Sequence, residues 1–232
     1  MSLEVFPIHG VPEVQRGDDL AGLIAAAEPG LRDGDVVVVT QKVVSKAEGA
    51  MARIDADDPR GHKAIVEDQS VRIVRRRGDL IISETKHGFV CANAGVDLSN
   101  VDDGWAALLP EDSDRSARRI RDGLRAALGV EVGVIVSDTF GRPWRRGLTD
   151  VAIGCAGIQA VVDLRGTEDS RGRILQVTEV CVVDELAGAA DLVMGKATDV
   201  AAAVVRGVDP AWLGRGEVHA EVIRPPQEDL FR

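Results

Sequence analysis

The sequence has few aromatic residues and few cysteines. Aromatics make up 3% of its 232 residues and tyrosine is absent, so we do not expect a surface of stacked rings for single-stranded nucleic acid. Because apolar residues still reach 45%, the core must be packed mainly from Val, Leu, Ile and Ala. Cys91, Cys155 and Cys181 stand singly in apolar surroundings. Without a CxxC pair they are predicted to be reduced core residues.

The sequence also lacks long apolar runs and a surplus of basic charge. No stretch approaches the roughly 18 apolar residues that a bilayer-spanning helix needs, and the segment MSLEVFPIHG has no signal-peptide pattern. The formal net charge of −10 disfavours general binding to nucleic acid or to an acidic membrane. We therefore expect a soluble, cytoplasmic protein with no nucleic-acid or membrane partner. Charges are screened beyond about 8 Å, so an anionic ligand would need a local basic cluster.

Hydrophobic patterning predicts an α+β fold. A chain of this length suits one large domain or two small lobes and can bury roughly 70% of its unfolded surface. Strands alternate with helices early and cluster in hairpins later, which favours mixed and antiparallel sheets with flanking helices. The predicted strands are 3–8, 36–39, 80–83, 89–92, 130–136, 151–158, 160–164 and 201–205, and the predicted helices are 20–27, 61–77, 113–128 and 178–194.

The stretch VEVGVIVSDTFGRPWRRGLTD, residues 130–150, joins a predicted buried strand to a polar, basic loop. Where that strand is expected to end, Asp138 and Thr139 can present two hard oxygen donors of the kind that Mg²⁺ and Mn²⁺ prefer. The guanidinium groups that follow, from Arg142 to Arg146, suit a ligand with several phosphate or carboxylate oxygens. On these residues alone, a helix cap with arginines in solvent is an equal alternative.

Two other loops contain candidate ligand-binding residues. Asp97 follows the strand predicted at 89–92, so it could meet Asp138 if the two strands are neighbours, and a shared divalent ion would relieve their repulsion. Turn formation by Asp and Asn is the competing interpretation. Lys42 and Lys46 follow a four-valine strand in the manner of a phosphate-binding edge, but the segment lacks the GxxxxGK[ST] pattern. We predict Lys42 to be a surface lysine and leave Lys46 as a candidate.

Six segments in this order resemble the coenzyme F-420-0:L-glutamate ligase family: IHGVPEV, DGDVVVVTQKVVSKAEG, ETKHGFVCANAGVDLSN, SDTFGRPWRRGLTD, VTEVCVVDELAGAADLVMGK and RPPQEDLFR. The resemblance runs from Leu3 to Arg232, so it implies one ligase domain over residues 1–232, with any boundary between lobes unresolved. It also implies a homodimer. The implied reaction adds L-glutamate to coenzyme F-420-0 at the expense of GTP, first as an amide and then as a γ-linked chain, with release of GDP and phosphate.

The resemblance also implies particular site residues. It places divalent ions, Mg²⁺ or Mn²⁺ and two in number, with K⁺ as a further candidate, on Asp97, Asp138 and Thr139. It implies GTP contacts at Val11, Pro12, Glu13, Val14, Gln41, Lys46 and Asn100, and at Gly195 and Lys196 in the segment that begins with Met194. Gln41 stands where some relatives have Ser.

For catalysis we predict roles for Asp138, Arg142 and Arg146, with metal ions and basic groups holding the triphosphate while an acyl phosphate forms. Two other functions are compatible with the same residues. One is a metal-dependent phosphohydrolase that activates water, and the other is a nucleotide-binding module without turnover.

Overall fold

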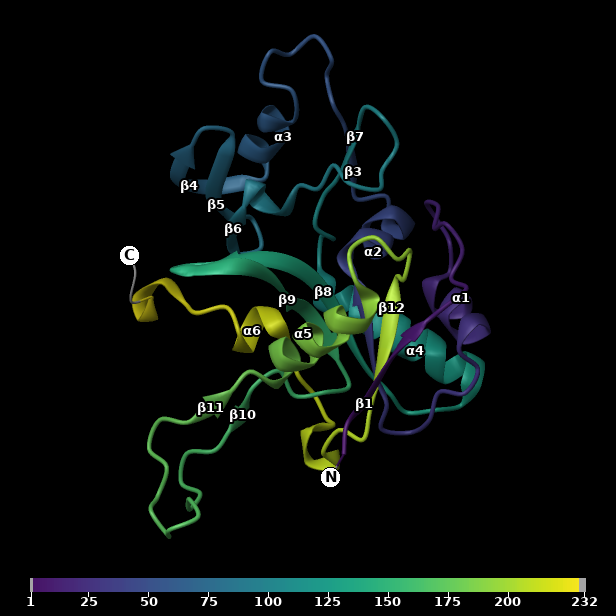
Figure 1. Cartoon of the computed structure of the whole chain (residues 1–232), viewed down its shortest axis with the longest axis vertical. Helices are drawn as coiled ribbons and strands as arrows, with labels where there is room; N and C mark the ends of the chain where they lie inside the picture. Colours follow the sequence, from purple (N-terminus) through teal and green to yellow (C-terminus); the bar gives the residue numbers. More distant parts are fainter. Residues whose placement is uncertain (1, 230–232) are drawn as a thin grey trace.

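A five-stranded mixed sheet forms the centre of the computed structural model, which describes residues 2–229. Its strand order is β1-β12-β2-β8-β9. The strands are β1 (Glu4–Ile8), β12 (Ala202–Arg206), β2 (Val36–Thr40), β8 (Gly133–Arg142) and β9 (Arg145–Ala156). Only the β2–β8 pair is parallel. The predicted α+β class with mixed sheets is therefore confirmed (Figure 1).

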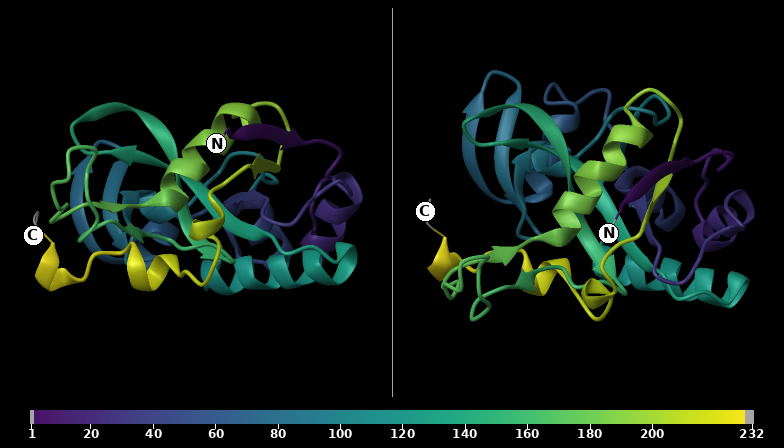
Figure 2. Two further views of the ribbon diagram at one scale, coloured as in Figure 1. Left: turned by 90° about the horizontal axis from the view of Figure 1, so that it is seen from below. Right: turned by 60° about the horizontal axis from the view of Figure 1, so that its bottom comes forward.

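The two faces of this sheet have separate apolar cores. Val37 and Val39 of β2 face a cluster built with α1 (Leu20–Ala27) and α4 (Ser113–Leu128), whereas Val36 and Val38 face α5 (Val182–Met194). Figure 2 shows α4 and α5 on opposite sides of the sheet. All four valines are fully buried, so the strand predicted at 36–39 is confirmed, and it is covered on both faces.

The chain between β2 and α4 makes a second, smaller assembly beside the main sheet (Figure 1). A three-stranded sheet of order β4-β5-β6 packs with a short helix and a two-stranded ladder around Val66, Ile81 and Ala106. Its elements are β3 (Met51–Arg53), α3 (His62–Asp68), β4 (Ser70–Arg77), β5 (Leu80–Thr85), β6 (Val90–Ala92), η1 (Asn93–Gly95) and β7 (Trp105–Ala107). Helix α2 (Gln41–Glu48), which precedes them, packs Val44 into the core of the main sheet. The division into two lobes stays a prediction.

The helix predicted at 61–77 is confirmed over its first part and wrong over the rest. Helix α3 ends at Asp68, and Ser70–Arg77 forms β4, which pairs antiparallel with β5. The β-branched residues Val71, Ile73 and Val74 favour a strand once a partner strand is beside them. The basic run at 75–77 therefore belongs to an exposed edge strand and not to a last helical turn.

Other predicted boundaries also move. β8 does not end at Ser137 but continues to Arg142 and pairs with β9 along its length. Where a helix was expected to begin at Thr178, two residues form β11 (Glu179–Val180) before α5, and β11 pairs with β10 (Val162–Asp163). The remaining short elements are η2 (Pro210–Trp212), α6 (Val218–Glu221) and η3 (Pro226–Glu228). None of the helices within residues 2–229 has the length and apolar character that crossing a bilayer requires.

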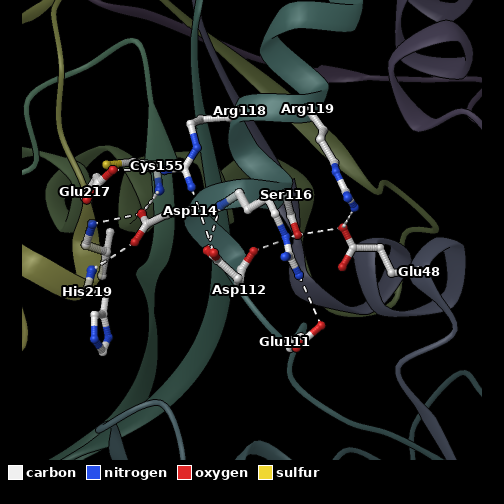
Figure 3. Close-up of polar contacts among 12 residues, drawn as sticks. Glu48, Glu111, Asp112, Asp114, Ser116, Arg118, Arg119, Cys155, Glu217 and His219 are labelled. Atoms are coloured by element: carbon white, nitrogen blue, oxygen red, sulfur yellow. Dashed lines mark hydrogen bonds and ion pairs between the residues drawn. The ribbon is translucent and has the colours of Figure 1, made fainter.

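The start of α4 is joined to two distant segments by one carboxylate (Figure 3). Asp112 caps the helix by accepting from the backbone N–H of Arg115. Asp114 accepts from the backbone N–H groups of Cys155 in β9 and Val218 in α6, at 2.8 and 2.9 Å, and from that of His219 at 3.0 Å. One buried side chain therefore holds α4, β9 and α6 together.

Candidate functional site

A cavity of about 700 Å³ lies at the carboxyl ends of β2 and β8. Because these strands are parallel, with Thr40 opposite Ser137, the polar residues that follow each strand meet at one edge of the sheet. Helix α2 begins directly after Thr40, and Lys42 and Lys46 lie one turn apart on it. Both lysines line the cavity.

The cavity brings together all the nucleotide and metal candidates predicted from the sequence. They are Val11, Pro12, Glu13, Val14, Gln41, Lys46, Asn100, Gly195, Lys196, Asp97, Asp138 and Thr139. Met194, the last residue of α5, is instead buried in the core beneath this helix. Arg142 and Arg146 are not among the lining residues. They lie at the exposed end of the β8–β9 hairpin, where Arg142 Nη2 donates to the Arg146 carbonyl at 3.4 Å.

Asp97 reaches the cavity from outside the main sheet. It follows η1 and forms an isolated bridge with Ala107, with backbone hydrogen bonds of 3.0 and 2.8 Å. The predicted condition for its approach to Asp138, that the two strands are neighbours, is met: β6 and β8 belong to different sheets but pack against each other. The two carboxylates line one cavity and repel each other.

The carboxyl group of Asp138 has an unusual titration. Its pKa is raised to about 7, mainly by burial and also by the negative charges of Asp97 and Asp150, while the hydrogen bond from the Thr139 N–H and the charge of Lys42 partly oppose the increase. At Asp97 burial also opposes ionisation, but the Ser99 N–H and the Lys42 ammonium outweigh it and lower the pKa. The cavity therefore contains a carboxyl group whose charged form lacks sufficient positive partners.

These donors fit a hard cation that a ligand helps to hold. Asp97, Asp138 and Thr139 offer oxygen atoms only, which suits Mg²⁺ or Mn²⁺. Across residues 2–229, no group of three or more His, Cys, Asp and Glu side chains is arranged to hold a metal ion. An ion bound to one or two carboxylates would complete its coordination with water and phosphate oxygens, as Mg²⁺ commonly does.

Three charged residues that line the cavity were not predicted from the sequence, namely Lys42, Asp150 and Asp199. Lys42, expected at the surface, has a side chain only 19% exposed, and its ammonium pairs with Asp97 at 2.9 Å and with Ser99 Oγ at 2.6 Å. Asp150 is 3% exposed and accepts from Ser137 Oγ at 2.9 Å and from Thr139 Oγ1 at 2.6 Å. Asp150 pairs with Thr139 across the β8–β9 hairpin, so a prediction that continued this strand past Ser137 would have pointed to Asp150.

Gln41 is buried and already engaged. Its amide nitrogen donates to Ser45 Oγ at 2.6 Å and to the Leu108 carbonyl at 2.7 Å. Both amide protons thus have acceptors within the protein. A ligand at this position would meet the Gln41 backbone or carbonyl oxygen and not its amide N–H groups.

Comparison with known proteins gives matches over nearly the whole chain. Residues 10–207 match the family model described as F420-0:Gamma-glutamyl ligase. A coenzyme F420:L-glutamate ligase of Methanothermobacter thermautotrophicus is 43% identical, with 100% of both chains covered. The protein of the same name from Methanopyrus kandleri is 44% identical over 100% of this chain and 98% of its own. That from Archaeoglobus fulgidus is 39% identical over 100% and 97%.

Proposed function

Because the chain belongs to the F420-0:gamma-glutamyl ligase family, we propose that it is a ligase that joins L-glutamate to coenzyme F420-0. We further propose that GTP drives the reaction, that GDP and phosphate are released, and that a γ-linked glutamate can follow the first amide. The observation that carries the proposal is the single cavity in which basic side chains of α2 lie beside Asp97 and Asp138.

A carboxylate is a poor acyl donor, so the reaction needs an activating step. In the proposed route, an oxygen of the F420-0 carboxylate attacks the γ-phosphorus of GTP, and GDP leaves with the electrons of the broken P–O bond. The amine of glutamate then attacks the acyl carbon, loses a proton, and displaces inorganic phosphate. Such phosphoryl transfer depends mainly on positioning and on compensation of negative charge.

The residues of the cavity supply both requirements. Lys46 is 15% exposed and pairs with Glu13 at 2.5 Å, which supports a role in holding phosphate oxygens beside the segment Val11–Val14. Asn100 also lines the cavity. Asp97, Asp138 and Thr139 would hold Mg²⁺ or Mn²⁺, which would offset the charge on the transferred phosphoryl group when bound.

For the arginines of the β8–β9 hairpin we propose a role in substrate binding outside the cavity. Arg142 and Arg146 are exposed and lie outside the cavity lining, so we propose that they contact a part of F420-0 that extends past the cavity. We also propose that the protein is a homodimer. Trp144 and Leu148 on the same hairpin are 84% and 68% accessible and offer apolar surface for such a contact.

The test is product release with one substrate withheld at a time. Purified protein with Mg²⁺ and GTP should release GDP only when F420-0 and L-glutamate are both present, and glutamate should appear in the deazaflavin product by mass spectrometry. Steady phosphate release without glutamate would instead identify a phosphohydrolase. No turnover together with tight GTP binding would identify a binding module.

A matched pair of lysine variants links turnover to the cavity. Lys46→Met should weaken GDP binding at least about tenfold in calorimetry, because it removes a positive charge beside the phosphates. Lys86→Met is the control, since Lys86 is half exposed and pairs with Asp68 away from the cavity. Equal GDP affinity in the two variants would contradict nucleotide binding at Lys46.

A further inference from the structure

Three lysines line the cavity within the described part of the chain, and they differ in how many N–H donors remain for a ligand. An ammonium group has three donors and no acceptor. Among contacts with residues 2–229, Lys46 uses one donor on Glu13, and Lys42 uses two, on Asp97 and Ser99. Lys46 therefore keeps two donors for a ligand and Lys42 keeps one.

Lys196 has the most partners, although its side chain is 56% exposed. Its ammonium lies 2.8 Å from Asp150 Oδ1, 2.6 Å from Asp191 Oδ1 and 2.6 Å from Thr139 Oγ1. Two of these partners are carboxylates, which form the stronger hydrogen bonds, whereas Lys42 and Lys46 each pair with one carboxylate. The charge of Lys196 is therefore the most fully offset of the three, and a phosphate oxygen has to compete with two carboxylates for it.

The same network determines the direction of the Thr139 hydroxyl. A carboxylate accepts and an ammonium donates, so the Thr139 proton must point to Asp150, while the Thr139 oxygen accepts from Lys196. The remaining lone pair of that oxygen can only accept. It suits a cation or an N–H group and would repel a phosphate oxygen.

Asp150 is the fixed point of this arrangement. It is 3% exposed, and its second oxygen accepts from Ser137 Oγ at 2.9 Å. Lys196 links it to Asp191 on the last turn of α5. The network therefore connects β8, β9 and the end of α5 at one wall of the cavity.

We propose that Lys196 is a positioning residue, which together with Asp150 orients the Thr139 hydroxyl as an acceptor and does not itself bind the nucleotide. The proposal deepens the ligase function above and rests on it for its kinetic consequences. Direct lysine contacts to the phosphates then fall to Lys46 and Lys42, whose ammonium groups retain donors.

The experiment compares Lys196→Met, Asp150→Asn and their double variant with Lys46→Met. Lys196→Met should lower kcat about tenfold or more but leave KM for GTP and the calorimetric affinity for GDP within about threefold of the parent. Lys46→Met should show the opposite pattern. Because Lys196 and Asp150 act as one unit, the double variant should lose no more kcat than the worse single variant. Lys196→Arg, which keeps the charge, should recover most of the loss.

Several results would overturn the proposal. A GDP affinity for Lys196→Met as weak as that of Lys46→Met would show direct binding, and so would an unchanged kcat accompanied by a raised KM. Additive losses in the double variant would separate Lys196 from Asp150. If Lys196→Met does not fold, Lys196→Arg decides, because a change of more than about tenfold in its GDP affinity would likewise indicate direct contact.

A failure of the ligase proposal would look different. The parent protein would then join no glutamate to F420-0, and if it also bound no GDP, neither lysine variant could change that. Thermal unfolding in chelator still tests the network, since Lys196→Met and Asp150→Asn should be coupled in melting temperature without any ligand present. Independent, additive shifts in that measurement would refute the network on structural grounds alone.

Discussion

Replacing Asp138 by Asn should stabilise the metal-free protein at neutral pH while removing most of its activity. Burial and the neighbouring carboxylates raise the pKa of Asp138 from 3.8 to about 7. Between these two values the folded protein retains a proton that the unfolded chain has released, so stability falls as the pH rises through this window. Above the folded pKa the loss is complete. Asn keeps the shape of the side chain and carries no charge at any pH.

The magnitude follows from the pKa shift. A shift of about 3 units corresponds to about 4 kcal/mol, at about 1.4 kcal/mol for each unit. Asp138 retains partial contact with solvent, which screens its charge, so we discount the gain to about 2 kcal/mol. For a chain of this size that corresponds to a rise in melting temperature of roughly 5 °C. The gain should reach its full size at pH 8 and shrink to under half at pH 5.

The assay is thermal unfolding in chelator from pH 5 to pH 8, with Asp68→Asn as the control. Asp68 has a side chain that is 70% exposed, so its substitution should shift the melting temperature little and equally at both pH values. Adding Mn²⁺ should raise the melting temperature of the parent and not that of Asp138→Asn, because a ligand stabilises only the state that binds it. A variant that is no more stable than the parent at pH 8, or whose gain is the same at pH 5, would refute the electrostatic argument.

Three further predictions address single contacts. Lys42→Met should raise Mn²⁺ affinity severalfold in the absence of nucleotide, because the Lys42 ammonium competes for Asp97 at 2.9 Å; titration by electron paramagnetic resonance checks this, and weaker binding would contradict it. Asp114→Ala leaves three backbone N–H groups without their acceptor, so urea unfolding should show a loss of about 3 kcal/mol or more. Gly154→Ala should cost roughly 3 kcal/mol in the same assay, since the added Cβ would lie 2.2 Å from the Ser113 carbonyl carbon; full stability would show that α4 can move away from β9.

The parts of the fold predicted correctly are those specified by local chemistry. Helix α4 has its cap at Asp112, its apolar face and the left-handed Gly129 at its end within one continuous segment. The valines of β2 indicate burial on both faces by themselves. The helix prediction fails over residues 70–77, where the hydrophobic pattern fits both a helix and a strand and the partner strand comes later in the chain. Strand β4 exists because β5 returns beside it, which no local window contains.

The same distinction explains what could be predicted of the site. Asp138 and Thr139 were identifiable as oxygen donors because they are adjacent, Asp97 and Lys46 were candidates because they follow predicted strands, and the family resemblance added the segment Val11–Val14. Lys196 illustrates the limit. Its residue type suggests a phosphate contact, but its ammonium is held by Asp150, Asp191 and Thr139, which come from three different elements.

Whether a lysine beside a phosphate site binds the ligand or holds the wall therefore depends on the acceptors that surround it. Asp150 occurs 46 residues before Lys196 in the chain, and their ion pair of 2.8 Å exists only because β9 pairs with β8 while α5 packs across that sheet. The chemical role of Lys196 is thus a property of tertiary structure. Lys42, Lys46 and Lys196 have different partners, so their substitution should affect kcat, KM and metal affinity differently. The variants above test these differences.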